Sequence, residues 1–150
     1  MLAFTGRYDY TIDDKGRLSI PSRLRDQVER DGQPLLLYVT LGAEGQLNAY
    51  AEKEYNELMG IFGVRNDDEA RAAFRAITQN TEPLPVDKQG RVMLSPKQRE
   101  VVGIKRDVVI IGVGKRMEFW DKAALARYEG DGAAHIASAM KALKARVDLY

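Results

Sequence analysis

The sequence predicts an α+β fold built from two copies of one unit. Three observations support this: segments of the first half recur in order in the second, apolar residues alternate with period two in strand-like segments, and each half ends in apolar residues at helical spacing. A length of 150 residues suits one compact unit, or two small ones that share a core. The predicted halves are residues 1–80, which include a helical insertion, and residues 81–150, which end in helices.

The repeat is clearest in one nine-residue segment. Residues 13–21 (DDKGRLSIP) align with residues 87–95 (DKQGRVMLS) at an offset of 74, with identical aspartate, glycine and arginine. Two further matches follow in the same order: residues 36–42 with 108–114 at an offset of 72, and residues 47–50 with 117–120 at an offset of 70. The offset falls by two at each loop, as expected when loops lose residues and elements are kept. Three matches in order indicate a duplication.

Each half is expected to begin with an extended segment, a tight turn and a second short strand. In the first half these are residues 4–12, 13–16 and 17–20. Glycine at the end of the turn permits a positive φ, and aspartate at its start can accept hydrogen bonds from nearby backbone amides. A short helix follows, from residue 21 or 22 through 28, and its counterpart has Ser95 as N-cap with proline at the first helical position.

A hairpin and two helices are predicted to complete each half. Residues 35–41 and 47–50 form the first hairpin, and its apolar character implies strands covered on both faces. Asp67 and Asp121 are expected to cap helices, and glycines interrupt the last two helices at residues 130–132. Helical spacing is found in three apolar sets: Tyr55, Leu58, Met59 and Phe62; Ala70, Ala73, Phe74 and Ile77; Ile136, Met140, Leu143 and Val147. The last set packs either on the chain's own core or on a neighbouring subunit.

The charges are unevenly distributed, although the formal net charge is only +1. Residues 1–25 hold five basic and three acidic side chains, and residues 85–106 hold six basic and two acidic. Residues 52–82 have the opposite balance, with four basic and seven acidic side chains. Two separate basic segments are compatible with nucleic-acid binding.

The two turns are the candidate site. An arginine at the exit of a tight turn is held rigidly at its base, and its planar fork suits a phosphate or the O6/N7 edge of guanine, so Arg17 and Arg91 are predicted to contact DNA. Asp13 and Asp87 either bond turn amides or orient the guanidinium. The nearby basic residues expected to contact phosphates are Lys15, Lys88, Arg23, Arg25, Lys97 and Arg99. An ordinary hairpin turn with a solvated salt bridge is the alternative interpretation.

These motifs resemble the AbrB/SpoVT swapped-hairpin DNA-binding proteins, and the two copies with a helical tail look more closely like the MraZ family. The resemblance extends from residue 6 to about residue 124. It implies a tandem swapped-hairpin β-barrel in which the two halves interleave, with peripheral helices and a C-terminal helix.

The same resemblance implies a function. MraZ proteins are bacterial transcriptional regulators that form closed rings and bind repeated short boxes upstream of their own operon of cell-division and cell-wall genes. The family's DNA-binding arginines correspond to Arg17 and Arg91, and the accompanying acids to Asp13 and Asp87. The expected partners are double-stranded promoter DNA and further copies of the chain, and the expected action is repression in the cytoplasm, at the nucleoid.

The second copy departs from the pattern of the first. Pro83 and Pro85 precede its turn, and proline cannot donate to a β-ladder. Gln89 replaces the equivalent of Lys15, and Ser95 stands where the first copy has Pro21. We therefore expect the two copies to be unequal.

Other classes of protein find little support in the sequence. With zero cysteines and one histidine, His135, it contains no recognisable catalytic set, metal cluster or phosphate-binding glycine loop, so no enzyme activity, cofactor, metal or small-molecule substrate is expected. No apolar run approaches a membrane span and no secretion signal is visible, so a cytoplasmic protein is expected. An oligomeric protein-interaction module and an AbrB-type antitoxin stay open as alternatives.

The aromatic and methionine residues are expected to have structural roles. Tyr38, Tyr50, Phe119 and Trp120 should pack between strands and helices. Methionines are expected to fill the core or contact a partner: Met59, Met93, Met117 and Met140.

Overall fold

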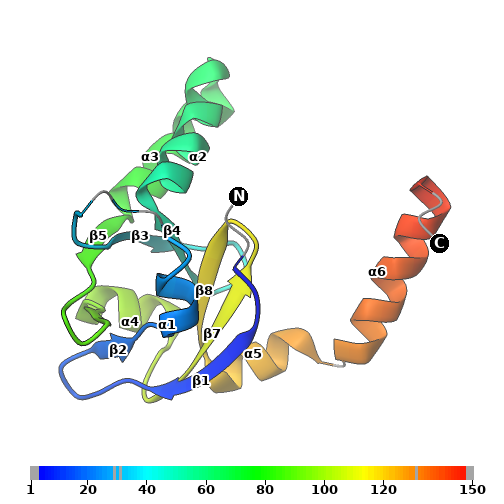
Figure 1. The fold of residues 1–150 in the computed structure, drawn as a ribbon. Coiled ribbons are helices and arrows are strands. Elements are labelled where there is room, and N and C mark those ends of the chain that lie inside the picture. The colour runs from blue at the N-terminus through cyan, green and yellow to red at the C-terminus, as the bar shows by residue number, and fades with distance from the viewer. Residues whose placement is uncertain (1–3, 29, 31, 131, 148–150) are drawn as a thin grey trace.

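A computed structural model describes residues 4–28, 30, 32–130 and 132–147. The element order strand–strand–helix–strand–strand–helix–helix occurs twice (Figure 1), which confirms the α+β class and the predicted duplication. The first half contains β1 Arg7–Thr11, β2 Arg17–Ser19, α1 Ser22–Arg25, β3 Leu36–Leu41, β4 Leu47–Ala51, α2 Glu52–Val64 and α3 Asp68–Gln79. The second contains β5 Glu82–Pro85, β6 Arg91–Met93, α4 Pro96–Val102, β7 Asp107–Val113, β8 Arg116–Asp121, α5 Lys122–Glu129 and α6 Gly132–Val147.

The strands form two antiparallel sheets, and both combine strands from the two halves. The larger has the order β1-β7-β8-β4-β3-β5, and the smaller is a ribbon of β2 and β6. β1 of the first half pairs with β7 of the second, and β5 of the second half pairs with β3 of the first. Exchanging the halves therefore converts one of these pairings into the other.

A pseudo-twofold axis relates the halves. Leu18 faces Val92 in the β2–β6 ribbon, and Asn48 faces Glu118 in the β4–β8 pairing. These partners are the repeat equivalents found in the sequence at offsets of 74 and 70. A residue that faces its own equivalent lies on the axis, so the axis passes through the middle of the ribbon and of the large sheet.

The predicted β-barrel is not closed, because the larger sheet is open and has β1 and β5 at its edges. The Val86 N–H donates to the Leu35 carbonyl at 2.9 Å. Backbone alternation therefore directs the nitrogens of Pro83 and Pro85 to the outer side of β5. Neither nitrogen carries a hydrogen, so this edge has no N–H at those positions for a further strand.

Buried side chains lie on both faces of the larger sheet. Val108 and Ile110 of β7 belong to the main core, which the ribbon, α1 and α4 also enter. Val109 alternates with them and packs with Trp120 and Leu125 under α5. The first hairpin, for which cover on both faces was predicted, has Leu37 and Val39 in the main core, while Tyr38 on its other face stacks on Tyr55 of α2 and is only partly buried.

Two predicted elements are shorter than expected. The first strand begins at Arg7 instead of Phe4, and Phe4 forms an isolated bridge to Gly114. The first helix ends at Arg25 rather than residue 28. Its N-cap is Pro21, which offers no side-chain hydrogen bond, whereas the Ser95 side chain caps the longer α4 as predicted.

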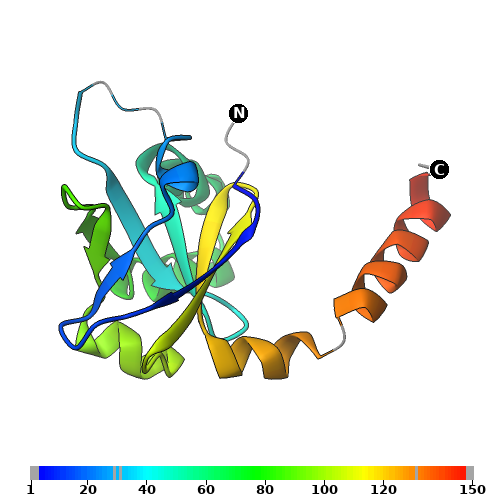
Figure 2. The ribbon, with the colours of Figure 1, turned by 60° about the horizontal axis from the view of Figure 1, so that its bottom comes forward.

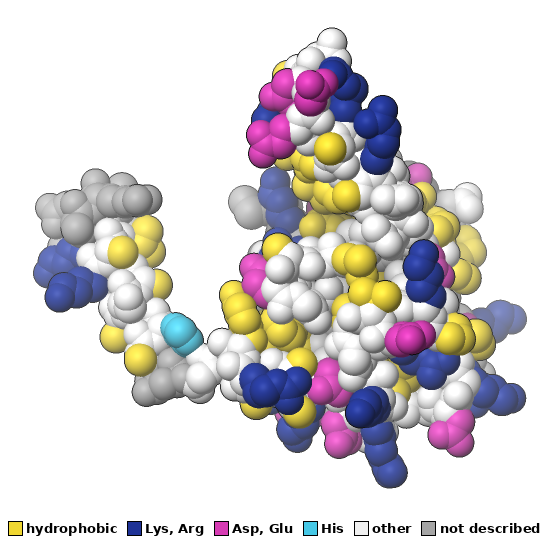
Figure 3. Space-filling model, turned by 180° about the vertical axis from the view of Figure 1, so that it is seen from behind, with side chains coloured by type: hydrophobic (Ala, Val, Ile, Leu, Met, Phe, Trp, Pro, Cys, Tyr) yellow, Lys and Arg dark blue, Asp and Glu magenta, His cyan; other side chains and the backbone are white. Residues whose placement is uncertain are grey.

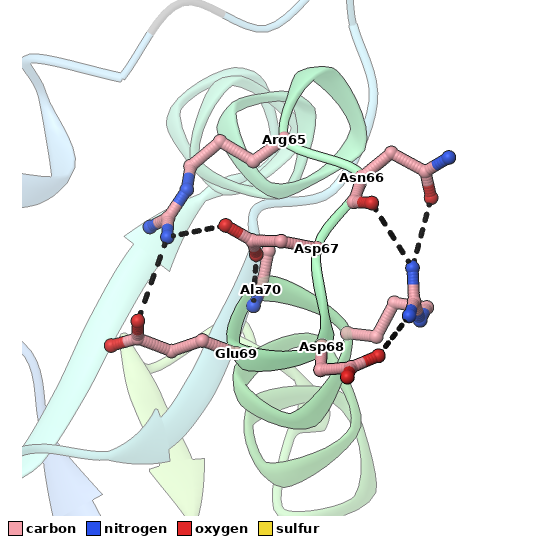
Figure 4. Close-up of polar contacts among 7 residues, drawn as sticks. Arg65, Asn66, Asp67, Asp68, Glu69 and Ala70 are labelled. Carbon is pink, nitrogen blue, oxygen red and sulfur yellow. Dashed lines mark hydrogen bonds and ion pairs between the residues drawn. The ribbon is translucent and has the colours of Figure 1, made fainter.

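The helices α2 and α3 form a hairpin that extends from one end of the sheet (Figure 1). At its tip the Asp67 side chain accepts from the Ala70 N–H at 2.8 Å, as predicted for an N-cap. Figure 4 shows that the tip is a compact group of ion pairs, in which Arg65 contacts Asp67 and Glu69. Arg71 also contacts Asp68.

The last helix, α6, extends away from the rest of the molecule in both ribbon views (Figures 1 and 2). Hydrophobic side chains are exposed along α6 and along the α2–α3 hairpin (Figure 3). The prediction left two surfaces open for the last helix, the core of its own chain and a neighbouring subunit. The helix does not pack on the core of its own chain.

The aromatic residues pack as expected. Tyr38 of β3 stacks on Tyr55 of α2 with ring centroids 4.7 Å apart, and Trp120 of β8 stacks on Tyr128 of α5 at 5.2 Å. Phe119 is fully buried. Within the described ranges, no helix has the length and apolar character needed to cross a membrane.

Candidate nucleic-acid interface

The Asp13–Arg17 segment forms a tight turn closed by two backbone hydrogen bonds. The Gly16 N–H donates to the Asp13 carbonyl at 3.0 Å, and the Asp13 N–H donates to the Arg17 carbonyl at 3.2 Å. Gly16 has a φ of +86°, a conformation that L side chains rarely adopt. A Cβ at this position would lie 2.5 Å from the backbone oxygen of Leu94. Both the turn and the close approach of the second half therefore require glycine.

The Asp13 carboxylate organises the first turn. Its Oδ1 accepts hydrogen bonds from the backbone N–H groups of Lys15 at 3.0 Å and Arg17 at 2.8 Å, and its Oδ2 accepts from Arg17 Nε at 2.6 Å. The hydrogen bond from the Arg17 backbone N–H holds the pKa of the Asp13 carboxyl below its ordinary value, and the Arg17 guanidinium adds to this effect. Asp13 thus bonds turn amides and orients the guanidinium, so it fulfils both of its predicted roles.

The second turn repeats this arrangement bond for bond. The Asp87 Oδ1 accepts from the backbone N–H groups of Gln89 at 2.9 Å and Arg91 at 3.0 Å, and its Oδ2 accepts from Arg91 Nε at 3.3 Å. The Arg91 backbone N–H is the main cause of a lowered pKa of the Asp87 carboxyl. Gly90 closes the turn with a φ of +79°. Gln89 stands where the first copy has Lys15, and the turn is kept because only the backbone N–H of this residue is used.

The β2–β6 ribbon brings the two turns together. Leu18 and Val92 at its centre are buried in the core. Side chains alternate across a strand, so Arg17 and Arg91 point away from the core. The two predicted contact residues therefore lie on one outward face, related by the pseudo-twofold axis.

Both arginine side chains can reach a ligand. Their exposed fractions are 34% for Arg17 and 31% for Arg91, and each ion pair runs through Nε. The terminal nitrogens of the two guanidinium groups make no hydrogen bond to another described residue. These nitrogens form the fork that binds a phosphate or a guanine edge.

Two further predicted residues, Arg25 and Arg99, cross to the opposite half. A Cβ on Gly90 would lie 2.6 Å from Cζ of Arg25, and a Cβ on Gly16 would lie 3.1 Å from Nε of Arg99. Arg25 Nε donates to the Ile20 carbonyl at 3.0 Å. Each arginine thus packs behind the turn of the other half, an arrangement that the linear sequence does not reveal.

The remaining predicted phosphate contacts are exposed. Lys15 and Lys88 lie in the two turns, Arg23 lies on α1 and Lys97 lies on α4. Arg25 and Arg99 add to these four residues, so at least three basic side chains lie close to each turn in sequence or in space.

For Met93, the structure excludes one of the two predicted roles. The sequence assigns Met93 to the core or to a contact, but it is 55% exposed on the outward face of the ribbon, so it does not fill the core. Its neighbour Val92 is buried. The period-two alternation of β6 would have identified Met93 as outward-facing.

Across the described segments, no group of three or more histidine, cysteine, aspartate or glutamate side chains could hold a metal ion.

Comparison with known proteins relates the whole chain to one family. The family model described as "MraZ protein, putative antitoxin-like" matches twice, at residues 3–75 and 77–147. The chain is 36% identical over 130 residues to the transcriptional regulator MraZ of Acetivibrio thermocellus, covering 85% of this chain and 87% of that protein. It is 33% identical over 132 residues to the Mesoplasma florum protein of the same name, covering 87% and 88%. For the Bordetella pertussis protein of that name, the identity is 36% over 128 residues, covering 85% and 89%.

These relatives are named transcriptional regulators, and the double match follows the internal repeat of this chain. The fold, the two turns and the comparisons agree: the chain belongs to the MraZ family.

Proposed function

We propose that this protein is a sequence-specific DNA-binding transcriptional regulator that contacts promoter DNA through its two Asp-x-x-x-Arg turns. The observation that carries the proposal is the pair of outward guanidinium groups, Arg17 and Arg91, on one ribbon and related by the pseudo-twofold axis. The major groove of DNA, about 12 Å wide, admits a two-stranded β-ribbon. Each arginine is oriented by an aspartate before DNA arrives, which reduces the conformational entropy lost on binding.

The surrounding cations fit contacts to the DNA backbone. Lys15, Lys88, Arg23 and Lys97 are exposed close to the turns and suit phosphates, which position a protein without specifying sequence. Arg25 and Arg99 are only partly exposed and support the turns from behind, so their phosphate contacts would come from the rim of the interface.

We further propose that residues 1–80 and 81–150 interleave as a tandem swapped-hairpin unit of the AbrB type. The pairings of β1 with β7, of β5 with β3 and of β2 with β6 support this arrangement, since each joins strands of opposite halves. A half on its own would lack these pairing strands, because each of them is supplied by the other half.

Assembly into a ring through the helical extensions completes the proposal. Ile136 of α6 is 67% exposed, and Val64 at the end of α2 is 86% exposed. Exposed apolar surface of this kind marks subunit contacts. Several chains held together would convert weak contacts with single boxes into avidity for repeated boxes. The regulated target would be the chain's own operon of cell-division and cell-wall genes, repressed at the nucleoid in the cytoplasm.

Fluorescence anisotropy tests the proposal, using a duplex from upstream of the protein's own gene and a scrambled duplex. The double variant Arg17→Ala/Arg91→Ala should bind the upstream duplex at least tenfold more weakly, because one bidentate arginine–guanine contact contributes about 1–3 kcal/mol. The matched control Arg75→Ala/Arg127→Ala removes two exposed arginines of α3 and α5 and should bind normally. Circular dichroism checks that both variants are folded.

The salt dependence of binding is a second readout. A plot of the logarithm of the affinity against the logarithm of the salt concentration should be a falling line. Its slope should be about −0.9 for each phosphate that the protein neutralises. Normal binding by the double variant, or a slope near zero, would refute the site. Equal binding of both duplexes, or of neither, would favour a protein-interaction role.

A further inference from the structure

The outward face of the β2–β6 ribbon is not symmetric. Its four outward positions form two equivalent pairs at an offset of 74: Arg17 with Arg91, and Ser19 with Met93. The arginines are identical and held alike, but the other pair places a small hydroxyl on one side of the axis and a long apolar side chain on the other. At this face, the pseudo-twofold symmetry is therefore broken at one pair.

The register puts each of these two side chains beside an arginine. Arg17 faces Met93, and Ser19 faces Arg91. The backbone bonds at either end of the ribbon, from the Leu94 N–H to the Gly16 carbonyl and from the Ile20 N–H to the Gly90 carbonyl, are both 2.8 Å long. Hydrogen-bonded and non-hydrogen-bonded pairs alternate, so both arginine pairs are of the non-hydrogen-bonded type, in which side chains lie closest.

Met93 is an unusual residue for such a position. The side chain is 55% exposed, while Leu18 and Val92 on the opposite face of the ribbon are buried, so it does not contribute to the core. A thioether chain is flexible and apolar, and the apolar group that the major groove offers is the 5-methyl group of thymine. A serine hydroxyl both donates and accepts, and so suits the polar edge of any base.

We propose that Met93 and Ser19 determine sequence specificity, with Met93 contacting a thymine methyl next to the base pair bound by Arg17. This inference rests on the proposed DNA-binding function. Since the ribbon presents an apolar group on one side of its axis and a hydroxyl on the other, the box it prefers is not a palindrome. The protein binds such a box in one orientation.

Deoxyuridine substitution tests the contact, because dU differs from dT only by the missing methyl. The probes are the shortest duplex that the wild-type protein protects in footprinting and a set in which each dT is replaced by dU in turn. One replacement should weaken wild-type binding about fourfold, the value expected from about 0.8 kcal/mol for one buried carbon. Met93→Ser should bind the original and the dU duplex equally, at the level of the wild type with dU.

The exchange variant Ser19→Met/Met93→Ser gives the sharper result. The axis interchanges the two positions, so this variant presents the wild-type pattern turned by 180°. It should bind the same box in the reversed orientation and regain the dU sensitivity that Met93→Ser loses. Val113→Ser is the control, since it replaces an exposed apolar residue at the far end of β7. It should keep the wild-type profile.

The outcomes separate this inference from the function on which it rests. If no dU replacement affects the wild type, or if Met93→Ser keeps the wild-type profile, the methyl contact is refuted although Arg17 and Arg91 are still required. If the double arginine variant binds as well as the wild type, the proposed function itself is refuted.

Discussion

At the scale of single residues, the two aspartates hold the candidate site in order. Each carboxylate accepts two backbone N–H groups of its turn and the Nε of the arginine that follows. One side chain therefore fixes both the turn and the guanidinium above it. Both turns make the same three hydrogen bonds, and the Nε to Oδ2 distance is 2.6 Å for Arg17 and 3.3 Å for Arg91.

The lowered pKa of Asp13 and of Asp87 gives a prediction about pH. A carboxyl whose pKa is lower in the folded state contributes stability above its ordinary pKa, and that contribution is lost as the pH falls through the folded-state value. NMR titration of the carboxyl carbons should give midpoints below 3.8 for both residues. Midpoints at or above 3.8 would mean that the amide contacts do not form in solution.

At the scale of elements, the two short helices behind the ribbon differ most between the copies. Ser95 Oγ accepts from the Gln98 N–H at 3.1 Å and donates to Glu82 Oε2 at 2.8 Å, so it links α4 to β5. Pro21 caps α1 without a side-chain hydrogen bond, and that helix is only four residues long. The inequality of the copies expected from the sequence is therefore found in the support of the ribbon as well as on its outward face.

The caps lead to a prediction about stability. Ser95→Ala removes the cap and should lower the free energy of unfolding by about 1 kcal/mol. Ser22→Ala, at the start of α1, removes an exposed hydroxyl and should change it by less than about 0.5 kcal/mol. Urea unfolding followed by circular dichroism measures both. Equal effects would contradict the difference between the two helix starts.

At the scale of the whole molecule, the duplication ends differently in the two halves. The helix α3 folds back on α2 to form a hairpin, whereas its counterpart α6 extends away from α5 (Figures 1 and 2). Residues 52–82 carry an excess of acidic side chains, and residues 132–147 carry no acidic side chain. Contact between α6 of one chain and the hairpin of another would bring together opposite charges and exposed apolar residues.

The proposed assembly predicts the effect of a change on α6. Ile136→Asp/Leu143→Asp places two charges on one face of the helix, because the residues are seven apart, and should reduce the assembly mass measured by light scattering. The unfolding midpoint of the separated chains should stay the same, since neither residue is in the core. His135→Asp/Ser138→Asp adds the same charges to another face of α6 and should leave the mass unchanged. An unaltered mass for the first variant would exclude this face from the contact.

Local chemistry explains how much the sequence alone could predict. The turns, the caps at Asp67, Ser95 and Asp121, and the glycines at positions 16 and 90 depend on hydrogen bonds between residues a few positions apart. The repeat itself was visible as three matches at falling offsets. The turns and caps are local, and the repeat is a match between two stretches of the sequence. The α+β class, the order of elements and the position of each arginine at the exit of its turn could therefore be predicted from the residues.

Only the tertiary structure decided which half supplies each partner. The pairing of β2 with β6, the packing of Arg25 and Arg99 behind opposite turns, the open edge at Pro83 and the exposure of Met93 all depend on contacts between residues far apart in the chain. Such contacts are selected by the packing of the whole core around the pseudo-twofold axis, and a pattern read along one segment contains no information about that choice. The sequence by itself thus determined the unit and its repetition, while the packing of one unit against the other determined the surface that the protein presents.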